Sequence, residues 1–147
     1  FILPGYNVRP GEIHGAVGGK QLNKLASFVK TRRENAEYFV KFFGNDERFI
    51  IQKEIGESSW FCFTMIINPK LHIDRKKVLQ KLKEANIEHR IITGGNFLRH
   101  DVIKYYDYEV VSRKNADIAH DYGFFVGNHP YDIRDKIDYL YKTLKNI

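Results

Sequence analysis

Apolar residues recur at helical spacing over the first third of the chain. Residues 12 to about 43 are predicted to be helical, in two pieces, and residues 1–10 are predicted to form a loop. Gly44 begins a Gly-Asn-Asp sequence that is expected to end the second piece. The apolar residues that mark the buried side of this second piece are Leu22, Leu25, Val29, Ala36, Val40 and Phe43.

Two apolar segments with strand character follow the long helix. Residues 48–55 and 59–67 are predicted to be strands that pair across a turn at Gly56. Residues 60–67 are apolar almost throughout, which is typical of a central strand covered on both faces.

The second half of the chain alternates helices and short strands. Asp74 is expected to cap a helix that runs to residue 85, and Asp132 a last helix with one apolar face. Strands are predicted at residues 87–93 and 124–126, with an irregular aromatic stretch at 96–112 and a short helix starting near Asn115. This order predicts an α+β fold in which helices pack on a small, mostly antiparallel sheet.

Composition limits the function classes. The chain has 147 residues, and 43% of them are apolar and 14% aromatic, which suits one folded domain and argues against disorder. No apolar run is long enough to cross a membrane. Cys62 is the only cysteine, so no internal disulfide is possible and a reducing compartment is favoured. The net charge of +6 is spread over mixed clusters, which favours solvated helix faces, although a basic α+β module that binds nucleic acid is the alternative.

Two polar turns are the best candidates for ligand contacts. Residues 94–99 and 127–130 each place glycine, asparagine and a basic side chain just beyond an apolar strand, and Asn96, Arg99 and His129 stand out there. Amides and cations suit a phosphate or a sugar hydroxyl, while ordinary turns are the alternative. The sequence contains no pair of histidines at metal-site spacing on one helix face, no acid pair and no Ser/His/Asp set, so no metal site is expected and the residues alone name no reaction.

The first predicted helix is unusually rich in small residues. Gly15, Ala16, Gly18 and Gly19 would let another backbone come very close. We therefore expect residues 1–20 to form an interdomain or dimer-contact loop with the start of a linker helix, and residues 21–147 to form a small α+β domain of a larger protein.

Several segments, taken in order, resemble the DegT/DnrJ/EryC1/StrS family. They are residues 5–25, 32–36, 58–63, 87–90, 95–99 and 123–129, which together extend over nearly the whole chain. Members of this family are vitamin B6-dependent enzymes that act on nucleotide-linked keto sugars.

The resemblance implies a fold, a cofactor and a partner. The chain would be the small C-terminal domain of an aspartate-aminotransferase-like (fold type I) enzyme, a cytoplasmic homodimer with its active sites at the subunit interface. Pyridoxal 5'-phosphate or pyridoxamine 5'-phosphate would be held mainly by a large domain that this chain lacks. Asn7 matches the residue that reaches the cofactor phosphate across the dimer, and Arg9 would support the phosphate or the substrate. The chain alone would be inactive.

The segment around Arg90 and residues 95–99 resembles one subgroup in particular. That subgroup comprises 3-dehydratases of nucleotide-linked 4-keto-6-deoxy sugars, which serve surface polysaccharide synthesis; a sugar aminotransferase is the alternative within the family. The resemblance implies substrate contacts for Arg90, Asn96, Arg99 and His129, and it implies no nucleic acid and no membrane as partner.

Overall fold

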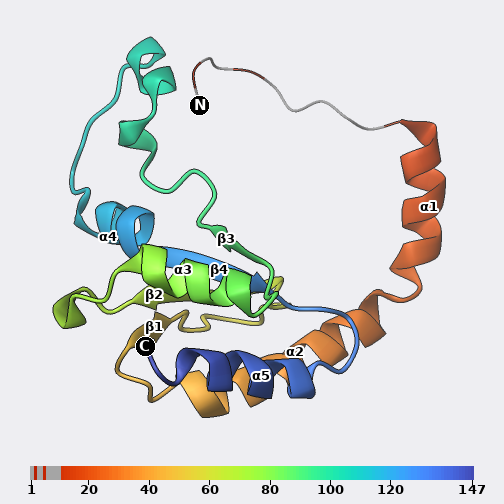
Figure 1. The fold of residues 1–147 in the computed structure, drawn as a ribbon. Helices are drawn as coiled ribbons and strands as arrows, with labels where there is room; N and C mark the ends of the chain where they lie inside the picture. Colours follow the sequence, from red (N-terminus) through yellow and green to blue (C-terminus); the bar gives the residue numbers. More distant parts are fainter. Residues whose placement is uncertain (1, 3–4, 6–10) are drawn as a thin grey trace.

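A four-stranded antiparallel sheet lies at the centre of the computed structural model, which describes residues 2, 5 and 11–147 (Figure 1). Its strands are β1 (Phe49–Ile51), β2 (Cys62–Ile67), β3 (His89–Ile91) and β4 (Gly123–Gly127), in the order β1-β2-β4-β3. Every neighbouring pair is antiparallel. The predicted α+β architecture is therefore confirmed.

Three helices build the core with this sheet. The helices α2 (Leu25–Phe43) and α3 (Arg75–Glu84) both contact α5 (Arg134–Leu144). Figure 1 shows α2 and α5 lying side by side below the sheet. The ring of Phe39 on α2 stacks on Phe63 of β2 with centroids 4.3 Å apart. The helical spacing predicts inward-facing apolar residues on α3 and α5, of which Leu79 and Tyr141 are only half-buried. The buried ones are Val78, Leu82, Ile137, Leu140 and Leu144, together with Ile133 just before α5.

The central strand is shorter and less covered than the sequence suggests. In β2, Phe63, Met65 and Ile67 are buried, whereas the alternate residues on the other face are half-buried. The helix α4 (Lys114–Tyr122) contacts β2 and β4 without covering that second face completely. The prediction of a central strand is confirmed, and the prediction that both faces are covered is wrong.

Trp60 precedes β2 instead of belonging to it. It is only 5% exposed, yet its φ of 48° places its backbone in the left-handed region. The hydroxyl of Ser58 accepts the Trp60 N–H at 3.0 Å, and Arg33 of α2 donates to the Ser58 carbonyl at 2.9 Å. The chain therefore enters the sheet through a turn anchored to α2, and the predicted strand from residue 59 is wrong at its start.

Two buried asparagines hold α2 to the other end of the chain. Asn35 and Asn128 are 1% and 4% exposed, and the Asn35 amide donates to the Asn128 side chain at 3.2 Å. The same amide donates to the carbonyls of His129 and Tyr131 at 3.2 and 2.8 Å, and its oxygen accepts the Ile133 N–H at 3.3 Å. This cluster fixes the loop between β4 and α5.

The helix α1 (Glu12–Leu22) has no buried residue and projects away from the sheet (Figure 1). Its glycines have no atom near the place of a missing Cβ. The expected close contact of this helix remains a prediction. Leu22, Leu25 and Val40 are exposed by 67%, 50% and 38%, so the prediction that they share the buried stripe of Ala36 and Phe43 is wrong. None of the described helices is long and apolar enough to cross a membrane.

Replacement of Trp60 by alanine is expected to lower the free energy of unfolding by about 3–5 kcal/mol, because it removes a large side chain that is buried in the core. The neighbouring Phe61 is 73% exposed, so Phe61→Ala is expected to cost about 1 kcal/mol or less. Urea denaturation of both variants measures the difference. Equal losses would contradict the placement of Trp60.

Replacement of Asn35 by alanine is expected to lower the free energy of unfolding by about 3 kcal/mol, because several buried polar groups lose their partners at once. The exposed Asn45, in the turn after α2, provides the matched control, and Asn45→Ala should change stability by about 0.5 kcal/mol or less. Thermal and urea unfolding would both register the effect. A near-neutral Asn35→Ala variant would mean that the cluster does not hold the loop.

Candidate functional site

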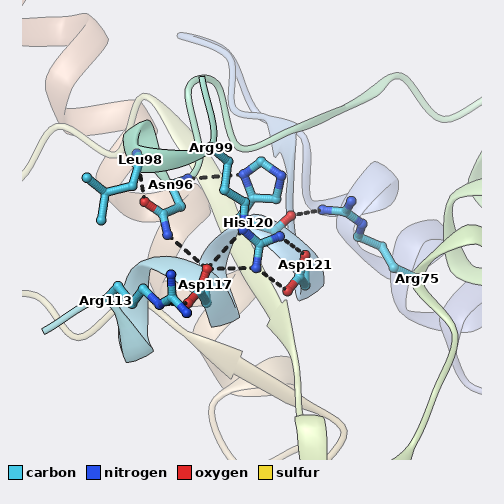
Figure 2. Close-up of polar contacts among 8 residues, drawn as sticks. All are labelled: Arg75, Asn96, Leu98, Arg99, Arg113, Asp117, His120 and Asp121. Carbon is cyan, nitrogen blue, oxygen red and sulfur yellow. Dashed lines mark hydrogen bonds and ion pairs between the residues drawn. The ribbon is translucent and has the colours of Figure 1, made fainter. Parts of the chain in front are cut away.

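The turn that follows β3 lies against α4 (Figure 2). Gly94 and Gly95 have φ values of 81° and 50°, and the turn continues into two short 3-10 helices, η2 (Phe97–Arg99) and η3 (Asp101–Tyr105). A Cβ atom on Gly95 would stand 2.4 Å from Nδ1 of His120 on α4. Glycine is therefore required at position 95 both by the backbone conformation and by the close approach of the imidazole.

Asn96 uses its polar groups inside the chain. It is 3% exposed, its amide nitrogen donates to Oδ1 of Asp117 at 2.8 Å, and its amide oxygen accepts the Leu98 N–H at 3.0 Å. Its backbone N–H donates to Nδ1 of His120 at 3.1 Å. This geometry suits a residue that shapes the turn, so any effect of Asn96 on a ligand would pass through its neighbours.

Arg99 is bound by two carboxylates of α4. Its Nε donates to Asp117 at 2.9 Å, and its two terminal nitrogens donate to Asp121 at 2.6 and 3.0 Å. The pKa of Asp117 lies below its usual range because Asn96 and then Arg99 donate hydrogen bonds to the ionised form. The Arg99 hydrogen bond also lowers the pKa of Asp121. The positive charge of Arg99 is thus balanced within the chain.

His129 lies at the opposite end of the sheet from this cluster. The strands β3 and β4 are antiparallel, so the segments that leave their carboxyl ends diverge. The exposed His129 ring stacks on Tyr131 with centroids 5.0 Å apart, and its carbonyl is held by Asn35. The two turns singled out in the sequence are therefore separate places in the structure.

The remaining predicted site residues are either exposed or outside the described residues. Arg90 on β3 is exposed, and its guanidinium lies 3.4 Å from a carboxylate oxygen of Glu88. Asn7 and Arg9 lie outside the residues that the structure describes. Within residues 2, 5 and 11–147, no group of three metal-ligating side chains is present.

Sequence reasoning missed the residues of α4 that complete the cluster. Asp117 and Asp121 are four positions apart, a spacing that places both carboxylates on one side of a helix, so this signal was available. His120 gave no such signal, because its partner is a backbone N–H from another part of the chain.

Comparison with known proteins identifies relatives over nearly the whole chain. The sequence model of the DegT/DnrJ/EryC1/StrS aminotransferase family matches residues 2–144. The GDP-4-keto-6-deoxy-D-mannose 3-dehydratase of Escherichia coli O55:H7 (strain CB9615 / EPEC) is 48% identical over 99% of this chain and 38% of its own length. The protein of the same name from Yersinia pseudotuberculosis is 45% identical over 99% of this chain and 37% of its own length. The chain thus spans little more than a third of these relatives.

Solved structures agree with the sequence comparison. The E. coli GDP-4-keto-6-deoxy-D-mannose-3-dehydratase with bound hydrated PLP matches with a TM-score of 0.89 at 48% identity, over 98% of this chain and 38% of that one. A DegT DnrJ EryC1 StrS aminotransferase from Brucella abortus matches with a TM-score of 0.79 over 97% of this chain and 37% of that one. At 15% identity, that second likeness shows the fold alone.

Replacement of Asp121 by asparagine is expected to lower the melting temperature near neutral pH by about 1–3 °C, because it removes one partner of Arg99. A carboxyl group with a lowered pKa stabilises the folded state above the unfolded pKa, near pH 4, and this contribution disappears as the pH falls through the folded pKa. The difference between the two proteins should therefore shrink as the pH falls below about 4 and vanish only below the folded pKa of Asp121. Calorimetry over pH would measure it, with the exposed Asp107→Asn as control; a constant difference would contradict the ion pair.

Proposed function

This chain belongs to the DegT/DnrJ/EryC1/StrS aminotransferase family, and from that premise we propose that it is the small-domain part of a vitamin B6-dependent nucleotide-sugar 3-dehydratase. The substrate we propose is GDP-4-keto-6-deoxymannose, and the reaction removes its hydroxyl at C3. The observation that carries this proposal is 48% identity to a relative of that name across 99% of the chain.

Dehydration is better supported than amino transfer. A further relative, from Saccharopolyspora spinosa, is 27% identical and is named dTDP-4-dehydro-2,6-dideoxy-D-glucose 3-dehydratase. The aminotransferases with similar structures are only 15–18% identical, which supports the fold and not the reaction. A relative named lipopolysaccharide biosynthesis protein RfbH favours a role in surface polysaccharide synthesis.

The described residues do not by themselves fit a complete cofactor site. Every described lysine is exposed or half-buried, and the half-buried Lys81 donates to the Asn146 carbonyl at 3.1 Å. We propose that pyridoxal or pyridoxamine phosphate is held mainly by a part of the enzyme that corresponds to the remaining length of the relatives. When bound, this cofactor acts as an electron sink for the sugar chemistry. Asn7 and Arg9 would supply an amide and a guanidinium to its phosphate.

Within this chain, we propose different roles for the candidate substrate residues. Arg90 and His129 are exposed and can offer a cation or a hydrogen bond to the nucleotide-sugar. Arg99 would contribute to the field around the substrate while it stays paired, and Asn96 would hold the turn that carries it. We further propose a cytoplasmic homodimer in which each active site takes residues from both subunits.

A nucleic-acid-binding module has less support. Tyr105, Tyr106 and Tyr108 are 51–59% exposed and could stack on bases. However, several arginines are already paired with carboxylates in the described part of the chain: Arg33, Arg48, Arg90, Arg99, Arg113 and Arg134. A titration with an oligonucleotide at two salt concentrations would reveal such binding by its steep salt dependence.

The protein encoded by the complete reading frame, supplied with the cofactor and GDP-4-keto-6-deoxymannose, is expected to yield a product that has lost the C3 hydroxyl. Mass spectrometry and NMR would distinguish it from a product with a new amino group at C4, which would make the enzyme an aminotransferase.

Asn7→Ala should release the cofactor more readily on dialysis than the unaltered enzyme does. The 147-residue chain alone should show no stable absorption band with pyridoxal phosphate; if neither product forms, the proposed function is wrong.

A further inference from the structure

The imidazole of His120 faces a backbone N–H from another element. Its Nδ1 accepts the Asn96 N–H at 3.1 Å, so this nitrogen carries no proton in the observed arrangement (Figure 2). The Gly95 backbone comes so close to the ring that a Cβ there would stand 2.4 Å from the same nitrogen. The close contact between the turn and the imidazole therefore requires an unprotonated Nδ1 on His120.

We propose that His120 is a positioning residue that latches the turn of residues 94–99 onto α4, and that the latch opens when the imidazole takes up a second proton. A doubly protonated imidazole carries a hydrogen on each ring nitrogen and has no acceptor left. Two N–H groups would then face each other where one hydrogen bond had been. The latch is a property of this chain and does not depend on the proposed enzyme activity.

Imidazole side chains in general change charge between about pH 5 and 8, so the other charged groups around His120 matter over that range. On α4, Asp117 and Asp121 have lowered pKa values and stay ionised in this range. Guanidinium groups stay protonated; those nearby are Arg99 of η2 and Arg75 of α3, which donates to the His120 carbonyl at 2.6 Å. His100, between η2 and η3, also lies near, with its ring centroid 6.4 Å from that of His120 and its Nε2 2.6 Å from the Gly94 carbonyl oxygen.

Opening of this latch would loosen the turn without unfolding the domain. The Asn96 side chain would keep its 2.8 Å hydrogen bond to Asp117, and Arg99 would keep its two carboxylate partners. The freed group is the Asn96 peptide N–H, so the change should concentrate at residues 94–96.

Amide hydrogen exchange, followed by NMR on the 147-residue chain, tests this latch. The Asn96 amide should lose about tenfold in protection between about pH 7.5 and about pH 5.5, the loss that follows when one sheltered hydrogen bond is removed. Protection is expressed relative to an unstructured peptide at the same pH. His120→Asn provides the matched variant. The asparagine Oδ1 is bonded to Cγ, as the histidine Nδ1 is, and it accepts a hydrogen bond without titrating. In His120→Asn, protection should be the same at both pH values.

Two further measurements keep the test decisive. His120→Ala should show low Asn96 protection at both pH values, and the buried Met65 amide of β2 should stay protected in every protein as a check on global unfolding. If His120→Ala does not fold, the comparison of the original chain with His120→Asn decides alone. Equal Asn96 protection at both pH values in the original chain would overturn the proposal. So would an unchanged pH response in His120→Asn, because the titrating group would then be another one, such as His100.

Discussion

The buried amide pair of Asn35 and Asn128 is the constraint on which the arrangement of this domain depends. The Asn128 amide donates to the carbonyls of Arg32 and Trp60 at 3.0 and 2.8 Å, while Asn35 serves the loop that leads into α5. Polar groups buried without partners are costly, so these contacts must form together or not at all. They join α2, the turn before β2 and the end of β4, which are far apart in the sequence.

This constraint explains why the two candidate turns differ in character. At the end of β4, the side-chain amide of Asn35 donates a hydrogen bond to the His129 carbonyl, and the His129 side chain is exposed at the surface. At the end of β3, the turn is held by its own side chains, because Asn96 and Arg99 reach across to Asp117 on α4. One turn presents its polar side chain outward, and the other uses its polar side chains to maintain its shape.

Much of the fold could be predicted from the spacing of apolar residues, since α3 and α5 bury the faces that their periodicity indicates, whereas α2 buries the predicted Ala36 and Phe43 but leaves Leu25 and Val40 exposed. The pattern could not show where strands end, because strand length depends on pairing with distant segments. Trp60 illustrates this limit: an apolar run suggested a strand there, yet the contact of Ser58 with Arg33 turns the chain at that point. The burial of Asn35 was equally inaccessible, since nothing in a helical pattern shows that an asparagine will meet several carbonyls from residues nearly a hundred positions away.

The residues that carry the family resemblance also have structural roles of their own. Gly95, Asn96 and Arg99 carry part of the resemblance to the 3-dehydratase subgroup, yet each has a structural task in this chain: close contact with His120, capping of η2, and pairing with Asp117 and Asp121. These tasks account for the three residues without any contact to a substrate. The exposed His129 ring stacks on Tyr131, while the loop there is held through the His129 backbone carbonyl. A ligand contact is therefore better sought first at His129 than in the more recognisable turn.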